Sequence, residues 1–192
     1  MRDHIMDIWP DRSEAQRILE DWTSNENLRK HAYAVEAAMR AYANKFAAYP
    51  DKWGIVGLLH DFDYEKYPDL KDHPFKGVSY LREQGYSEEL TEAVLAHAAH
   101  TGVSRDTLLK KCIFAVDELT GLIVAVALVR PSKKLADVSV QSIMKKWKEK
   151  SFASGADRKM IEQGAEELGV TLGEHIEIVL NAMQQISDKL RL

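Results

Sequence analysis

Apolar residues recur every three or four positions along most of this chain, which is the spacing of one helix face. The clearest stripe comprises Leu28, Ala32, Val35, Met39, Tyr42 and Phe46. No stretch alternates apolar and polar residues in the manner of a half-buried strand. The pattern therefore predicts an all-α protein, with helices over about 14–22, 25–48, 53–61, 74–84, 88–100, 105–129, 140–148, 157–168 and 171–190.

Capping and helix-breaking residues mark the expected helix ends. Ser13 with Gln16, and Thr171 with Glu174, have the spacing of capping boxes. Single N-caps are expected at Ser87 and Ser104, and helix stops at Gly85 and Gly102. Pro50 is expected to break the chain before the third helix, and residues 1–12 to form an irregular arm.

Composition narrows the class of protein. A chain of 192 residues with 45% hydrophobic and 29% charged residues suits one globular domain, residues 1–192. A net charge of −4 gives no reason to expect a nucleic-acid partner, and a lone Cys112 excludes a disulfide framework. Met1–Pro10 lacks the apolar core of a signal peptide, and the apolar run Leu122–Val129 is too short to span a membrane. We expect a cytoplasmic protein without a membrane partner.

Metal-competent side chains lie on apolar helix faces at three places. His31 lies on the stripe described above, His60 and Asp61 end the apolar run that begins at Trp53, and Asp117 shares a face with apolar neighbours. Burying a neutral polar group without a partner costs about 2–7 kcal/mol. A metal ion would supply such a partner, and imidazole with carboxylate suits Fe, Mn, Zn or Co.

The order His … His-Asp … Asp in an all-helical chain resembles the HD superfamily of metal-dependent phosphohydrolases. The resemblance covers about residues 24–131 and implies an HD-domain-like helical bundle, here followed by additional C-terminal helices over about 132–192. It implies that His31, His60, Asp61 and Asp117 hold a first metal ion. In branches with a second ion the HD aspartate bridges, and His73 and His97 match its other ligands. His100 is the alternative to His97, because the spacing to Gly102 departs from the best-studied branch.

The resemblance implies hydrolysis of a small phosphate ester, mono- or diester, or of a nucleotide. Metal-activated hydroxide would attack phosphorus, with His60 and Asp61 at the catalytic centre. The expected cofactors are two divalent ions, Fe, Mn or Zn. Two alternatives remain: a di-iron oxygenase of the same superfamily, and a non-catalytic nucleotide-binding or regulatory module. Basic side chains could reach the substrate phosphate. The candidates are Lys76, Arg105, Arg130 and Lys133.

The remaining polar residues suggest ordinary roles. His4 and His175 are expected at the surface, and Cys112 in the core as a small apolar residue. Asp63, Glu65 and Asp69 are expected to be solvated loop carboxylates, with hydrogen bonding to a metal ligand or contact with the substrate as the alternatives. The lysines between 133 and 150 are expected to form a solvated face. The sequence leaves the substrate and the oligomeric state open.

Overall fold

The computed structural model describes residues 7–192, and within this range it contains ten α-helices and no β-strand. The prediction of an all-α fold is therefore confirmed. The predicted position of His4 lies outside the described residues. The α-helices are α1 (Arg12–Trp22), α2 (Glu26–Lys45), α3 (Pro50–Leu59), α4 (Phe75–Glu83), α5 (Glu88–Ala96), α6 (Leu108–Leu128), α7 (Val140–Trp147), α8 (Arg158–Glu167), α9 (Leu172–Gln185) and α10 (Ser187–Leu190).

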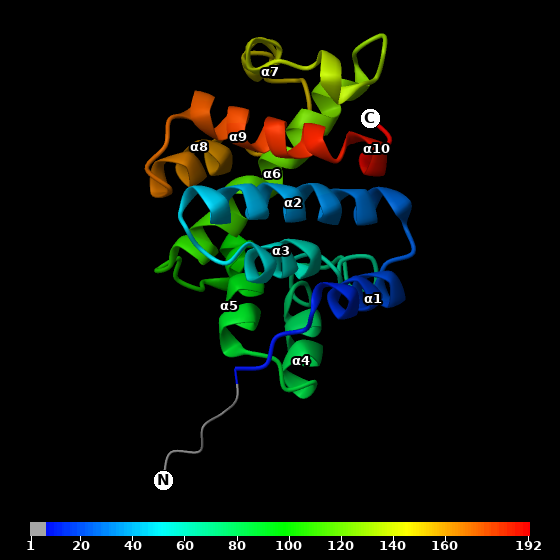
Figure 1. Ribbon diagram of the computed structural model, residues 1–192, viewed down its shortest axis with the longest axis vertical. Helices are drawn as coiled ribbons and strands as arrows, with labels where there is room; N and C mark the ends of the chain where they lie inside the picture. Colours follow the sequence, from blue (N-terminus) through cyan, green and yellow to red (C-terminus); the bar gives the residue numbers. More distant parts are fainter. Residues whose placement is uncertain (1–6) are drawn as a thin grey trace.

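Helix α2 lies in the middle of the molecule, between two groups of helices (Figure 1). α3 and α1 lie on one side of it, with α4 and α5 beyond them, whereas α8, α9 and α10 lie on the other. α6 crosses from the α5 side to the far end, where α7 is found. No helix among residues 7–192 is both long and apolar enough to cross a bilayer.

The closest helix contact in the core joins α2 and α3. A Cβ atom added to Gly57 on α3 would lie 2.8 Å from both the Cα and the backbone nitrogen of Glu36 on α2. Only glycine allows the two backbones to approach this closely. The contact places the C-terminal end of α3, with His60 and Asp61, beside the N-terminal half of α2, which carries His31.

The C-terminal helices share one hydrophobic core with the rest of the chain. Ile161 on α8 and Val179 on α9 are fully buried in the cluster that also contains Val35 and Leu119. α8 packs directly on α6, since a Cβ atom on Gly164 would meet the Cα of Ala115 at 2.5 Å. This packing holds the segment before α8 against the middle of α6.

His175 is fully buried, so the prediction of a surface position is wrong. Its Nδ1 accepts a hydrogen bond from the hydroxyl of Tyr42 at 2.5 Å, and its Nε2 donates to the carbonyl of Ala115 at 2.8 Å. The ring therefore joins α9 to α2 and α6 as a neutral imidazole. Burial lowers its pKa to about 4.

Several helix starts differ from the predicted ones. Asp11, and not Ser13, caps α1, because its side chain accepts from the backbone nitrogen of Glu14. α3 begins at Pro50 itself, which needs no backbone N–H in the first turn. Thr107, and not Ser104, caps α6, so this helix starts three residues later than expected. The predicted irregular arm is in part docked, since Pro10 is buried and the Ile8 carbonyl accepts from Ser87.

The helix predicted over 88–100 ends early, at Ala96. A short 3-10 turn, Ala99–Thr101, follows, and Gly102 adopts a left-handed conformation with φ of 69°. The Thr101 hydroxyl lies 2.9 Å from the carbonyls of both Leu95 and Ala98, which satisfies backbone acceptors at this break. His97 and His100 therefore do not share one helix, as the sequence pattern suggested.

Candidate metal centre

Four predicted ligands meet where α2, α3 and α6 come together. His31 from α2 and His60 from the end of α3 bring their Nε2 atoms to 3.2 Å. The Asp117 Oδ1 on α6 lies 3.0 Å from the first of these nitrogens and 3.4 Å from the second. Asp61 Oδ2 completes the group at 3.5 Å from the His60 Nε2. These four side chains could hold one metal ion.

A second group of possible ligands adjoins the first. His73, from the loop before α4, and His97, just after α5, bring their Nε2 atoms to 3.3 Å. Both nitrogens lie 3.2 Å from Asp61 Oδ1. Asp61 therefore turns one carboxylate oxygen to each group, and the second group could also hold an ion.

The orientation of the imidazole rings tests whether the site suits a metal. The Nδ1 of His60, His73 and His97 each faces an acceptor: the Gly57 carbonyl at 2.8 Å, the Asp63 carboxylate at 2.7 Å and the Val94 carbonyl at 2.5 Å. These acceptors place the ring proton on Nδ1. The lone pairs on Nε2 then point at one another, and no donor from residues 7–192 lies between them, which is the arrangement of metal-ligating histidines.

The distances between the possible ligand atoms also suit a metal ion. Atoms bonded to one ion at about 2.0–2.2 Å lie roughly 3–3.5 Å from each other. Within each group most of the separations given above fall in this range. His31 to Asp61 is longer, at 3.8 Å. The residues present therefore fit a divalent cation in both groups.

Asp63 holds the second group in place, so the expectation of a solvated carboxylate is wrong for this residue. Its side chain is 1% exposed. One oxygen accepts from His73 Nδ1 and the other from the backbone N–H of Gly77 at 2.7 Å. A Cβ atom on Gly77 would lie 2.9 Å from the Asp63 carboxylate carbon, so glycine lets the first turn of α4 approach.

Charges within the cluster balance one another. Burial alone would lower the pKa of His60, but Asp61 and Asp117 raise it well above its usual value. Burial would raise the pKa values of the two aspartates, yet the histidines around them hold both well below the usual range. The pKa of His73 rises to about 9, because Asp61 and Asp63 outweigh its burial. The carboxylates thus favour positive charge at this place in the fold.

Comparison with known families supports the same assignment. The HD domain family model matches residues 28–122, about half of the chain, and this range includes all six of the possible ligands. The chain belongs to the HD superfamily. HD domains are generally metal-dependent phosphohydrolases. Searches of curated proteins and of solved structures found no match.

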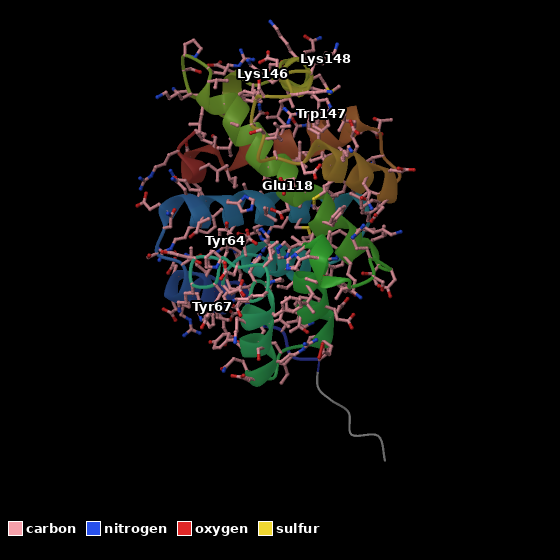
Figure 2. All side chains as sticks on the ribbon, turned by 180° about the vertical axis from the view of Figure 1, so that it is seen from behind. Tyr64, Tyr67, Glu118, Lys146, Trp147 and Lys148 are labelled. Carbon is pink, nitrogen blue, oxygen red and sulfur yellow. The ribbon has the colours of Figure 1, made fainter. Side chains whose placement is uncertain are left out.

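A cleft of about 630 Å³ opens on the metal-competent side chains of the HD domain. Tyr64 and Leu70 from the loop after α3, and Ala98–His100 after α5, line parts of its wall. Glu118 and Gly121 on α6 line another part, and Ala153, Gly155, Ala156 and Met160 close it from the C-terminal extension. Figure 2 labels Tyr64 and Glu118 in the middle of the molecule. Sequence reasoning missed Glu118 and the segment 153–160, since their approach depends on the packing of α8 against α6.

His100 lies at the rim of this cleft and not among the converging nitrogens. Its Nε2 lies 2.9 Å from the backbone carbonyl of His73, and its ring meets Phe75 edge-on. His97 occupies the position beside Asp61 instead.

The four basic residues expected to bind substrate do not line the cleft. Arg105 forms a two-pronged ion pair with Glu167, at 2.6 and 2.8 Å, and lies over the ring of Phe114. Lys76 is exposed on the first turn of α4. Arg130 and Lys133 lie beyond the end of α6, about 20 Å along the helix from Asp117. None of the four therefore lies in the wall of the cleft. Lys76 and Arg105 were chosen for their nearness in sequence to the ligands, and Arg130 and Lys133 for a locally basic stretch, and neither criterion shows where a side chain lies in the fold.

Proposed function

We propose that this HD domain is a two-metal phosphohydrolase that acts on a small phosphate ester. His31, His60, Asp61 and Asp117 would hold one divalent ion, and Asp61, His73 and His97 the other. The observation that carries the proposal is the arrangement of Asp61, whose two oxygens face two separate groups of Nε2 lone pairs. Fe, Mn and Zn all suit this mixture of imidazole and carboxylate.

Bound divalent ions supply an activated water and charge relief for the phosphoryl oxygens. The protein's part is to hold the ligands in place before substrate arrives. The acceptors on Nδ1 fix the rings of His60, His73 and His97, and Asp63 ties His73 to the start of α4. Asp61 and Asp117 remain about one-fifth exposed, on the side where the cleft opens. A phosphate ester in the cleft would reach the ligand cluster from this side.

Elemental analysis of protein purified with and without air tests the metal assignment. We expect two equivalents of Fe, Mn or Zn per chain, and hydrolysis of at least one member of a panel of phosphomonoesters and nucleotides. Asp61→Asn should lose both the bound metal and the hydrolysis, whereas Asp69→Asn should keep them, because Asp69 is a strongly exposed loop aspartate.

Three outcomes would contradict the proposal. Metal-free protein with normal turnover would exclude the metal centre. Metal-loaded protein that consumes oxygen with a substrate, but releases no phosphate from any ester, would favour the di-iron oxygenase. Full metal content without turnover of any kind would favour the non-catalytic module.

A further inference from the structure

The wall of the cleft beyond the metal ligands carries an unusual charge for a phosphate-binding site. Among the residues that the structure describes, no lysine or arginine lines it. Phosphate sites commonly use these side chains to pair with phosphate oxygens. Within residues 7–192, Glu118 is the one carboxylate on the wall that belongs to neither ligand group.

Glu118 is held close to the metal-competent cluster. It follows Asp117 directly on α6, so its side chain starts within one helical turn of the proposed ligands. Its Oε2 accepts from the backbone N–H of Asp157 at 3.1 Å, which connects it to the start of α8. One carboxylate oxygen is thus anchored by the C-terminal extension, and the side chain lines the cleft.

Open space adjoins this carboxylate. Gly121 lies three residues further along α6 and also lines the cleft, and a Cβ atom added there would meet no atom within 4 Å. Gly155, on the opposing segment, is equally free. Glycine inside a helix costs roughly 0.5–1 kcal/mol relative to alanine. Packing does not require it at position 121, so the glycine leaves room for a ligand beside Glu118.

A charge balance indicates what that ligand carries. Two divalent ions and the carboxylates of Asp61 and Asp117 would leave two net positive charges, which one dianionic phosphoryl group neutralises. Glu118 then remains as a negative charge in a partly buried wall. A second anionic group on the substrate would meet repulsion there, whereas an ammonium group would meet an opposite charge.

We infer that the substrate has a single phosphoryl group and, a few bonds away, an amine that pairs with Glu118. This inference rests on the proposed function and narrows it. Phosphorylated amino alcohols fit the description. Nucleoside di- and triphosphates and phosphorylated carboxylic acids do not, because each adds negative charge near Glu118.

Binding of three non-hydrolysable phosphonates tests this without turnover. They are 3-aminopropylphosphonate, propylphosphonate and 3-phosphonopropionate, which share a chain of three carbon atoms and differ in the charge at the far end. Titration calorimetry at pH 8 on protein of known metal content would give the three Kd values. We expect the amine to bind at least about tenfold more tightly than the carboxylate, which corresponds to one ion pair of about 1.4 kcal/mol.

Variants locate the source of the preference. Glu118→Gln should bring the three Kd values together, and Glu118→Lys should reverse their order. Glu166→Gln is the matched control, because Glu166 is exposed on α8 and does not line the cleft. It should bind like the wild type. Circular dichroism checks that each variant is folded. If a Glu118 variant does not fold, the ratio of the Kd values of the wild type still tests the inference.

The outcomes separate this inference from the proposed function. Metal-loaded wild type that binds all three phosphonates equally, or prefers the carboxylate, would overturn the role of Glu118 and leave the metal centre intact. A preference that persists in Glu118→Gln would overturn it as well. Protein without metal that binds none of them would instead contradict the proposed function.

Discussion

Two sets of buried histidines in this small helical bundle have opposite surroundings. His60 and His73 lie among carboxylates that raise their pKa values, whereas His175 faces only a tyrosine hydroxyl and a backbone carbonyl and has a lowered pKa. Both nitrogens of His175 are satisfied by protein groups. In His60, His73 and His97 only Nδ1 has such a partner, and Nε2 points toward other lone pairs.

The comparison shows how a structural histidine differs from one that is placed to ligate a metal ion. Burial is similar in both sets, so burial alone does not distinguish them. What differs is the number of protein partners for each ring and the presence of an unshared lone pair. Substitutions in the two kinds of histidine and in their partners test this distinction, from the largest expected effect to the smallest.

Replacing Asp61 by alanine should abolish the centre. Asp61 faces both groups of nitrogens, so Asp61→Ala should lose both ions and reduce kcat/KM by on the order of 10³-fold or more. Metal analysis and turnover measure the two effects. His175→Gln is the control from the other set and should keep its metal. A stoichiometric metal content in Asp61→Ala would contradict the assignment.

Removing either histidine of the second group should release one ion only. His73→Ala and His97→Ala each lose an Nε2 lone pair, so we expect about half of the wild-type metal content. His100→Ala should retain both ions and at most raise KM, since His100 contacts a backbone carbonyl at the rim. The metal content of the three variants shows which of these histidines bind the second ion. Loss of an ion in His100→Ala with full content in His97→Ala would reverse the roles of these two residues.

Replacing Asp63 should weaken the second site without removing a ligand. Asp63→Asn keeps an acceptor of similar shape but loses the charge beside His73 Nδ1. Such outer partners of metal-ligating histidines typically contribute 10–100-fold to metal affinity. Competition with a chelator should show a fall of about this size for one of the two ions. An unchanged affinity would mean that Asp63 serves only to join the loop to α4.

The smallest effect concerns His175 and pH. Its pKa is lowered to about 4, against about 6.5 in an unfolded chain, so the unfolded state binds more protons between these values. Stability from this group is present above pH 6.5 and is lost as the pH falls toward 4. Between pH 7 and pH 5 we expect a loss of about 2 kcal/mol. Denaturant unfolding in the presence of a chelator measures it, and His175→Gln should show a loss smaller by this amount.

The sequence predicted the first four ligands because they lie on apolar helix faces or at the end of one, whereas loop residue His73 was matched through the resemblance to the HD superfamily. His31 and Asp117 interrupt apolar stripes, and His60-Asp61 ends an apolar run, so helical periodicity alone brings them to the interior. His97 also follows its stripe, although its helix ends before His100. That early end depends on hydrogen bonds of Thr101 to two carbonyls, which no spacing rule indicates.

The parts that sequence reasoning missed depend on contacts between distant segments. Arg105 pairs with Glu167, 62 residues away, and not with a substrate. His175 finds its partners on α2 and α6. Glu118 becomes part of the cleft only when α8 packs on α6 through Gly164. A local pattern shows that a residue faces inward, but it does not show what the residue meets there.

The position of Asp61 between the two groups has a consequence for how the ions bind. An ion bound to one carboxylate oxygen would draw electron density from the other oxygen and would also fix the orientation of the shared side chain. If both groups bind an ion, the affinities of the two sites would therefore be thermodynamically linked, and by reciprocity each ion would change the affinity of the other by the same factor. A titration of the metal-free protein would then be described by a coupling free energy in addition to two intrinsic constants.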